Sequence, residues 1–348
     1  MRSSSKASTV QCGIDGWIEQ NLDSGRVVSR NQVSSSSWSS ASVYTTDSGT
    51  KYFVKQSKAG ADDGMFKGEA LGLQAMYGTH TLRIPKVFHY GQLADAPGGR
   101  GLGGGGYFIV MEHLNFTGRA SQEELGRGLA QMHLAEPTED NAKQGKFGFP
   151  VDNTIGGNPQ PNGWMDNWVD FYRERRLRHM LRLVNDSRLT DMGERVAKNM
   201  DKMFEGVKVK PSLLHGDLWS GNLSVVEGGQ WAILDPACYY GHHEADFGMQ
   251  WCAGFSGPFW QAYHEVIPKD PGFEDRKQLY MLYHYLNHTS LFGGMYKGSA
   301  ESILRHLSTQ QKRLPETYKI ASRQAAPSLA LVGSSLVHDR GPPYSHTT

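Results

Sequence analysis

Three side chains that carry oxygen atoms are spaced for phosphoryl transfer within residues 213–235. Asp217 follows a short apolar run, Asn222 comes five residues later, and Asp235 ends the next apolar run. These segments flank a turn at residues 227–230, so the hairpin they can form would bring all three side chains into one pocket. In such a pocket one aspartate lies near the acceptor hydroxyl, while an asparagine and a second aspartate hold a divalent cation beside ATP. Singly, each residue could be a turn former or a helix cap, but together they predict a kinase-type site.

A lysine and a glutamate stand ahead of this segment in the order that kinases use. Lys55 ends an apolar strand, and Glu69 falls within an expected helix over residues 65–76. A strand lysine paired with a helix glutamate holds the α- and β-phosphates in kinases. A surface ion pair is the alternative interpretation for either residue.

A serine-rich segment precedes the expected hairpin of residues 42–46 and 51–55. It includes Ser36, Ser37 and Trp38, where a kinase-like lobe has its phosphate-covering loop. Such loops usually contain glycine, because backbone N–H groups must approach phosphate closely. Here serine hydroxyls could share those contacts, and a plain serine-rich connector is the competing interpretation.

Composition limits the classes of partner. The chain has 348 residues, 20% of them charged, and a net charge of +1. We therefore expect no nucleic-acid or membrane partner. Its three cysteines, an odd number, show no zinc spacing, which favours a reducing intracellular compartment. The serine-rich, basic N-terminus resembles the end of a transit peptide or an ordinary disordered terminus, so plastid and cytoplasm both remain open.

The expected elements indicate an α+β chain. Strands at 84–90 and 107–112 follow the first helix, and helices dominate afterwards. Further helices are expected at 123–134, 164–184, 190–204, 259–266, 276–291 and 300–313.

Other polar residues receive structural interpretations. The arginines in the 164–184 helix are read as a solvated face, and His133 as a packed core residue. His242 and His243 lack a third ligand at suitable spacing, which argues against a metal. Asp246 is expected to cap a helix or to support the catalytic turn.

The sequence resembles the fructosamine/ketosamine-3-kinase family. The matching stretches cover roughly residues 14–305 in the family's order, and 147–156 and 217–222 are the most specific. The others lie at residues 46–49, 53–55, 65–69, 110–114, 215–216, 235–237, 240–242, 244–246 and 283–288, and at Trp164, Trp168, Phe171, Arg176 and Leu177.

The resemblance implies a protein-kinase-like, two-lobed fold that uses ATP and Mg²⁺ to phosphorylate the 3-hydroxyl of ketosamines, including glycated protein lysines. The family's product is unstable and releases the free amine. A small, mainly antiparallel-sheet N-lobe would span 14–112 and a larger helical C-lobe 113–324, between flexible ends at 1–13 and 325–348. The implied roles are Asp217 as base, Asn222 and Asp235 as metal ligands, Lys55 and Glu69 at the phosphates, Glu112, His113 and Leu114 around adenine, and His215 and Trp219 at the substrate, with packing as the alternative for Trp219.

One departure from the family concerns the phosphate loop. Many members carry Gly-Cys-Ile there, and the cysteine forms intermolecular disulfides, whereas this chain has Ser37-Trp38-Ser39. The difference argues against that redox switch and favours a monomer. Two other functions remain open: a small-molecule kinase of the aminoglycoside or choline kinase type, and a catalytically silent ATP-binding protein. Between sugars, ribulosamine is preferred over fructosamine because the family's less specialised members favour it, and no residue decides the choice.

Overall fold

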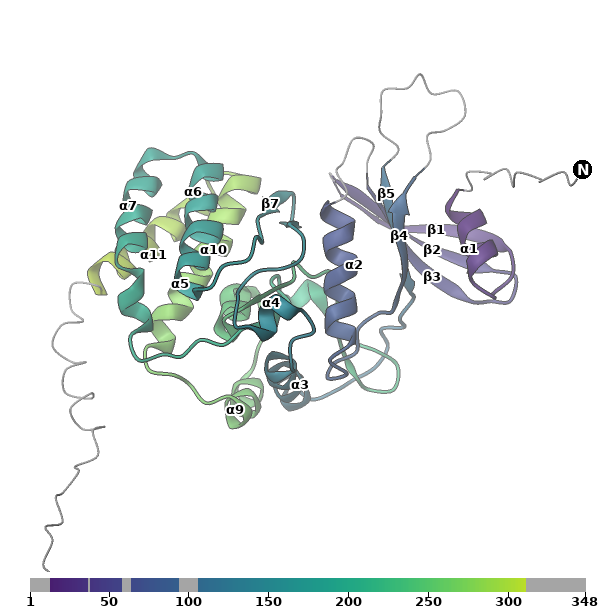
Figure 1. Cartoon of the computed structure of the whole chain (residues 1–348). Coiled ribbons are helices and arrows are strands. Elements are labelled where there is room, and N and C mark those ends of the chain that lie inside the picture. Colours follow the sequence, from purple (N-terminus) through teal and green to yellow (C-terminus); the bar gives the residue numbers. More distant parts are fainter. Residues whose placement is uncertain (1–12, 37, 58–63, 94–105, 311–348) are drawn as a thin grey trace, which may run out of the picture. The chain divides into compact units, whose positions relative to one another are not determined.

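Residues 27–112 contain a five-stranded antiparallel sheet in the order β1-β2-β3-β5-β4. A computed structural model describes residues 13–36, 38–57, 64–93 and 106–310 (Figure 1). Strand-forming runs on both sides of the Asp47–Thr50 turn pair as expected. The strands are β1 (Val27–Ser35), β2 (Ser39–Thr46), β3 (Lys51–Ser57), β4 (Val87–Gln92) and β5 (Tyr107–Glu112).

The two faces of the sheet have different neighbours, because side chains alternate along a strand. On one face, Tyr52 and Val54 of β3 pack with Ile14 and Ile18 of helix α1 (Ile14–Asn21). On the other face Lys55 points toward helix α2 (Gly64–Tyr77), which lies between the sheet and the helical lobe (Figure 1). This alternation places the lysine in the cleft.

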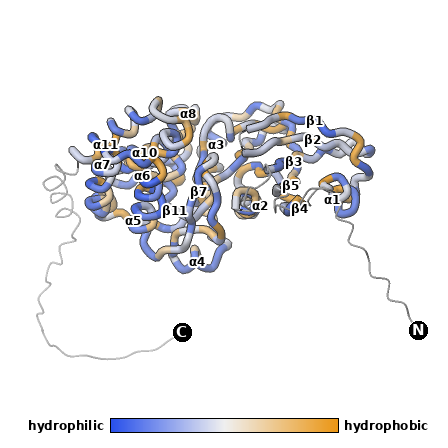
Figure 2. Tube along the Cα trace, turned by 90° about the horizontal axis from the view of Figure 1, so that it is seen from above, coloured by the Kyte–Doolittle hydropathy of each residue, from blue (hydrophilic) through white to orange (hydrophobic). Residues whose placement is uncertain are grey.

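Residues 113–310 form a helical lobe. Helix α10 lies at its centre and packs against α6, α11 and the turn at His243–Met249. Hydrophobic and hydrophilic stretches alternate along the trace of single helices, which fits amphipathic packing around a common core (Figure 2). The helices are α3 (Gln122–Leu134), α4 (Asp140–Lys143), α5 (Trp168–Phe171), α6 (His179–Val184), α7 (Ser187–Lys198), α8 (Gln250–Ala253), α9 (Gly257–Val266), α10 (Phe273–Phe292) and α11 (Lys297–Gln310).

Three short antiparallel strand pairs lie in the helical lobe near the cleft. Strand β8 (Ser212–Leu214) pairs with β11 (Tyr239–Gly241), and β9 (Leu223–Val225) pairs with β10 (Trp231–Ile233). The third pair, β6 (Asn153–Ile155) with β7 (Asn158–Gln160), forms a hairpin. The α+β fold with an antiparallel sheet lobe and a helical lobe is therefore confirmed.

Several boundaries differ from those predicted. The strand expected at 84–90 is β4, and the helix expected at 190–204 divides into α7 and a 3₁₀ turn, Met200–Phe204. The helix expected at 164–184 begins at Trp168 and contains a π-helical segment, Tyr172–Arg178. Such segments hold one residue more per turn and often occur near functional sites.

The prediction that the arginines of this helix form a solvated face is wrong for Arg176. Its side chain is fully buried, and the guanidinium stacks on Phe171 and Tyr239. It also donates to the carbonyl of Pro161 (2.7 Å) and to Asn162 Oδ1 (2.7 Å). Residue 176 lies four positions from Tyr172 and Met180, but that spacing alone does not distinguish a buried arginine from an exposed one.

Some predictions fall on residues outside those described. They concern Ser37, the N-terminus up to residue 12 and the tail from residue 325. Strand β5 ends at Glu112, and the division between the two lobes at this residue stays a prediction. In the described ranges, every helix is too short or too polar to cross a membrane.

Candidate active site

The loop that carries Asp217 follows directly after β8. Gly216 adopts a left-handed conformation (φ 82°), and a Cβ there would overlap the carbonyl of Ala237. Glycine therefore permits the tight turn between the buried strand and the cleft. The backbone N–H of Asp217 donates to His215 Nδ1 (3.2 Å), which fixes the start of the loop.

The carboxylate of Asp246 holds the backbone of this turn in place. Its carboxylate accepts hydrogen bonds from the backbone N–H groups of His215 (2.9 Å) and Gly216 (2.6 Å). His133 Nε2 lies 2.9 Å from the same carboxylate, and His133 Nδ1 contacts the hydroxyl of Tyr263. Burial alone would raise the pKa of Asp246, but these contacts, led by the His133 hydrogen bond, hold it below its usual range. The expectations that Asp246 supports the turn and that His133 is buried in the core are both met.

His215 does not face the cleft, which corrects its predicted role at the substrate. The ring is fully buried, and Nε2 donates to the carbonyl of Leu234 (2.8 Å) while Nδ1 accepts from Asp217. Both ring nitrogens are thus occupied by the backbone around Asp217 and Asp235. Burial lowers the pKa of His215 and favours the neutral ring that these contacts need. We therefore interpret His215 as a residue that positions Asp217.

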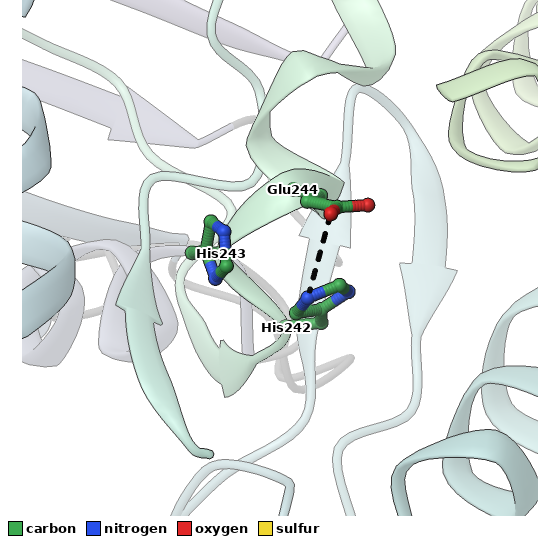
Figure 3. A group of neighbouring side chains, drawn as sticks. All are labelled: His242, His243 and Glu244. Carbon is green, nitrogen blue, oxygen red and sulfur yellow. Dashed lines mark ion pairs between the residues drawn. The ribbon is translucent and has the colours of Figure 1, made fainter. Parts of the chain in front are cut away.

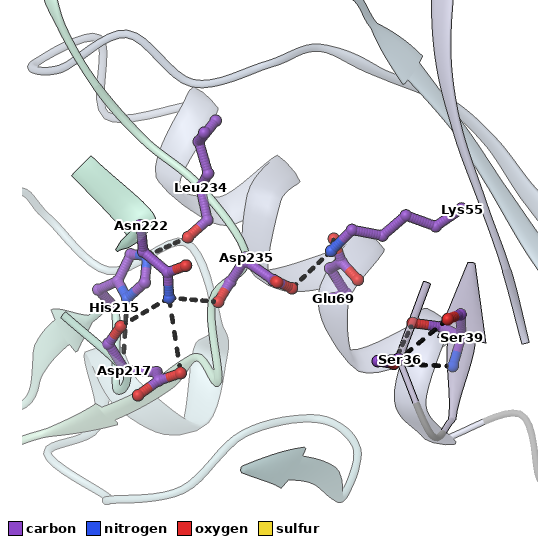
Figure 4. A network of polar contacts seen from close by, with 9 residues as sticks. All are labelled: Ser36, Ser39, Lys55, Glu69, His215, Asp217, Asn222, Leu234 and Asp235. Carbon is purple, nitrogen blue, oxygen red and sulfur yellow. Dashed lines mark hydrogen bonds and ion pairs between the residues drawn. The ribbon is translucent and has the colours of Figure 1, made fainter. Parts of the chain in front are cut away.

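The predicted metal ligands lie beside Asp217 (Figure 4). Asn222 Nδ2 donates to the carbonyl oxygen of Asp217 (2.9 Å) and lies 3.4 Å from that of Asp235. The backbone of Asp235 is left-handed (φ 56°), an uncommon conformation for a residue other than glycine, and its side chain is 59% exposed. The β9–β10 hairpin expected from the sequence thus brings Asp217, Asn222 and Asp235 close together.

Lys55 lies between two carboxylates (Figure 4). Its Nζ is 2.7 Å from Glu69 Oε1 and 2.5 Å from Asp235 Oδ1. The lysine charge holds the pKa of Asp235 below its usual range. Burial outweighs the same attraction at Glu69 and raises its pKa to about 7.

The environment of Asp217 suits a general base. Burial and the neighbouring negative charge of Asp235 raise the pKa of Asp217 to about 7. A base with a pKa near the working pH combines a useful ionised fraction with a strong tendency to accept a proton. Asp217 and Asp235 are thus two nearby carboxylates whose pKa values are shifted in opposite directions.

Two adjoining cavities, of about 350 and 390 Å³, meet around these residues. Asp217 and Trp219 line the first, and His113 and Leu114 line the more apolar second cavity. Both share Lys55 and Asp235. An acceptor would fit the first cavity and an adenine base the second. The amide and carboxylate oxygens of the predicted ligands are hard donors of the kind that Mg²⁺ prefers, so the site fits that ion.

The remaining predicted ATP-binding residues have mixed surroundings. The Glu112 side chain pairs with Arg83 and accepts from the N–H of Lys86 (3.2 Å), so it fastens the link between the lobes. Ser36 Oγ accepts from the N–H groups of Trp38 (3.3 Å) and Ser39 (3.1 Å), so this hydroxyl shapes the turn itself. Ser36 and Trp38 also line the first cavity.

The His242, His243 and Glu244 side chains offer ligand atoms within 4.8 Å of one another (Figure 3). However, both Glu244 oxygens accept from Arg276 (2.7 and 2.8 Å), and His242 Nδ1 contacts the Tyr280 hydroxyl (2.7 Å). The neighbouring guanidinium would repel a cation. The expectation that no third ligand lies near is therefore wrong, because Glu244 does. The absence of a metal rests instead on these contacts and stays a prediction.

Comparison with known proteins identifies the family. The model of the family described as fructosamine kinase matches residues 12–310. The chain belongs to the fructosamine kinase family. It is therefore a phosphotransferase.

Named members of the fructosamine kinase family align over most of their length. The chain is 45% identical to a chloroplastic protein-ribulosamine 3-kinase of Oryza sativa subsp. indica, over 83% of this chain and 81% of that protein. It is 37% identical to the ketosamine-3-kinase of Mus musculus, over 76% and 90%.

Solved structures agree with this membership. A candidate fructosamine-3-kinase from Thermobifida fusca superposes with a TM-score of 0.71 at 27% identity, covering 85% of this chain and 98% of that chain. An aminoglycoside phosphotransferase in complex with AMP-PNP and hygromycin B shares the fold, with a TM-score of 0.52 at 16% identity over 87% and 99% of the two chains.

Proposed function

We propose that this fructosamine kinase family member is a ketosamine 3-kinase that acts on ribulosamines attached to protein lysines. The observation that carries the proposal is the position of Asp217 in the acceptor cavity, beside Asn222 and Asp235 and within the same cleft as the Lys55–Glu69 pair. The names of the Oryza sativa and Mus musculus relatives support the ketosamine acceptor, and the plant name supports ribulosamine on protein.

The residues would divide the reaction as follows. The 3-hydroxyl oxygen forms a bond to the γ-phosphorus of ATP, the bond from that phosphorus to the β–γ bridging oxygen breaks, and the hydroxyl proton passes to Asp217. Lys55, held by Glu69, would bind the phosphates. Mg²⁺ bound by Asn222 and Asp235 would neutralise charge on the phosphates. Positioning and charge stabilisation therefore supply the catalysis, and no covalent intermediate with the protein is needed.

The nucleotide-binding site and the cellular location are proposed on the same family grounds. The adjoining apolar cavity at His113 and Leu114 would hold adenine. Ser36 and Trp38, which line the acceptor cavity, would lie over the phosphates. A plastid location is supported by the chloroplastic plant relative, with cytoplasm as the alternative. We propose that the enzyme acts as a monomer and has glycated proteins, rather than nucleic acids, as partners.

The test is ATP consumption by the purified full-length protein with Mg²⁺. Ribulosyl-lysine and fructosyl-lysine are compared as acceptors, free and attached to a carrier protein, with unmodified lysine as the control. We expect turnover with both adducts, faster with ribulosyl-lysine. Choline and an aminoglycoside form a second arm, and turnover confined to either of them would replace the proposal with a small-molecule kinase. ATP binding without turnover on any acceptor would indicate a silent nucleotide-binding protein.

A further inference from the structure

The segment 147–156 has no role in the chemistry described so far, although it is among the most specific of the sequence. Its first part is a core element: Phe147 and Phe149 are buried, and Gly148 exchanges two backbone hydrogen bonds with Tyr240 of β11 (2.8 and 3.1 Å). Its second part is strand β6, which packs against helix α2. The segment therefore connects the catalytic strands with the helix that carries Glu69.

Asn153 is the residue at which these contacts meet. A Cβ on Gly68 of α2 would overlap Asn153 Cβ, so the helix backbone and the hairpin are in direct contact at this point. Asn153 Nδ2 donates to the carbonyl of Cys238 (2.9 Å), three residues after Asp235. One side chain thus contacts both the helix behind Glu69 and the chain that follows Asp235.

The other side of Asn153 is held by buried amides. Its Oδ1 accepts from Gln160 Nε2 (2.8 Å) and Asn162 Nδ2 (2.9 Å). Gln160 Oε1 in turn accepts from the Tyr283 hydroxyl (2.6 Å), and Asn162 Oδ1 accepts from Arg176 Nη2 (2.7 Å). Each of these buried hydrogen bonds is costly to break, because its loss would leave a donor or an acceptor unpaired away from water. The buried guanidinium of Arg176 therefore has a function as the anchor of this network.

Gly72, on the same face of α2 as Gly68, also lets the helix backbone lie close to the catalytic segment. A Cβ on Gly72, one helical turn beyond Gly68, would lie 2.7 Å from Cys238 Cβ. Gly68 and Gly72 thus allow α2 to lie directly on the hairpin and on residues 236–238. Since Glu69 immediately follows Gly68, any outward movement of this face would draw Glu69 away from Lys55.

We propose that Asn153 is a positioning residue that holds α2 against the catalytic segment and thereby fixes Glu69 at Lys55. The 147–160 region would then keep the phosphate-binding pair formed without any separate activation step. This inference rests on the proposed ATP-dependent reaction for its rate measurement.

The test is a double-mutant cycle between the packing face and Glu69. Gly68→Ala and Asn153→Ala are each made in the wild-type background and in Glu69→Gln. Gly78→Ala, just beyond the end of α2, is the matched control because a Cβ there meets its neighbours at an ordinary 3.5 Å. For each protein we measure kcat/KM for ATP, the Kd of AMP-PNP and the melting temperature.

We expect both variants to lower kcat/KM for ATP about tenfold in the wild-type background and less than about twofold in Glu69→Gln. The position of residue 69 can affect the rate only while it carries the carboxylate that pairs with Lys55. AMP-PNP affinity should follow the same pattern, and Gly78→Ala should match the wild type. Equal losses in both backgrounds, with melting temperature falling in parallel, would overturn the inference and leave Asn153 a stability residue. If Gly68→Ala fails to fold, Asn153→Ala alone decides the outcome.

The AMP-PNP measurement separates this inference from the proposed function. It requires no acceptor, so it can be made even if no ketosamine is phosphorylated. Coupling of AMP-PNP affinity to Glu69 without ketosamine turnover would uphold the role of Asn153 and reject the proposed substrate.

Discussion

The ammonium group of Lys55 lies 2.5 Å from a carboxylate oxygen of Asp235, and this contact joins the sheet lobe to the loop after β10. Lys55 thereby neutralises a carboxylate that the proposed mechanism assigns to Mg²⁺. Binding of magnesium and nucleotide would replace that lysine with a stronger cation and release Lys55 toward the phosphates. We therefore expect Asp235 to control how much magnesium the enzyme requires.

Asp235→Asn should weaken magnesium binding without unfolding the protein. The variant loses a charged oxygen ligand, so we expect the Mg²⁺ concentration for half-maximal activity to rise at least about tenfold and turnover to fall on the order of a hundredfold. A magnesium titration at saturating ATP measures both. Asp191→Asn, an exposed aspartate on α7, is the matched control and should behave as the wild type. An unchanged magnesium requirement in Asp235→Asn would refute the ligand assignment.

The pH profile should report the ionisation of Asp217. Its pKa is raised to about 7, so the carboxylate form that accepts the proton declines as the pH falls through 7. We expect kcat/KM to fall about tenfold per pH unit below that value, since kcat/KM reports groups of the free enzyme. Asp217→Asn should cut turnover by on the order of a hundredfold or more and remove this limb of the profile. A flat profile in the wild type between pH 5 and 8 would contradict the assignment of the base.

The proximity of the candidate catalytic residues could be predicted from the sequence because its signals are local. Asp217, Asn222 and Asp235 follow short apolar runs, and the hairpin between β9 and β10 forms where the turn residues indicated. His215 and Arg176 were misjudged because their burial depends on partners distant in sequence, such as Asp246 and Tyr239. Likewise, nothing in the spacing of 147–160 reveals that Asn153 would contact Gly68, since that contact exists only after the lobes have assembled.

Trp219 offers a test of the acceptor cavity. Its side chain lines that cavity and remains 38% exposed, so its aromatic face is accessible to a ligand. Trp219→Ala should raise the KM for ribulosyl-lysine by about tenfold, the equivalent of roughly 1.4 kcal/mol, and leave the KM for ATP unchanged. Trp219→Phe keeps an aromatic face and should recover most of the loss. Equal increases in both KM values would indicate that Trp219 only packs the loop.

Acid should destabilise the protein partly through His284. Burial lowers the pKa of this α10 histidine to about 3, whereas in the unfolded chain it is near 6.5. The unfolded state therefore takes up a proton first as the pH falls, and His284 removes about 2 kcal/mol of stability between pH 7 and pH 5.

The raised pKa values of Asp217 and Glu69 act in the opposite direction, so the measurement must be a difference between proteins. Urea unfolding of His284→Gln and wild type at pH 7 and pH 5 supplies it. The loss of stability on acidification should be smaller by about 2 kcal/mol in the variant, and identical losses would refute this account.

The indole of Trp38 lies against the hairpin turn, where a Cβ on Gly157 would come within 3.2 Å of the ring. The loop proposed to cover the phosphates thus touches the helical lobe at Gly157, and Trp38 also lines the cavity of Asp217. We expect ADP departure to require separation of this contact, so lobe opening would compete with chemistry to limit the rate of each catalytic cycle. A pre-steady-state burst of phosphorylated product would then be the kinetic signature of slow lobe opening.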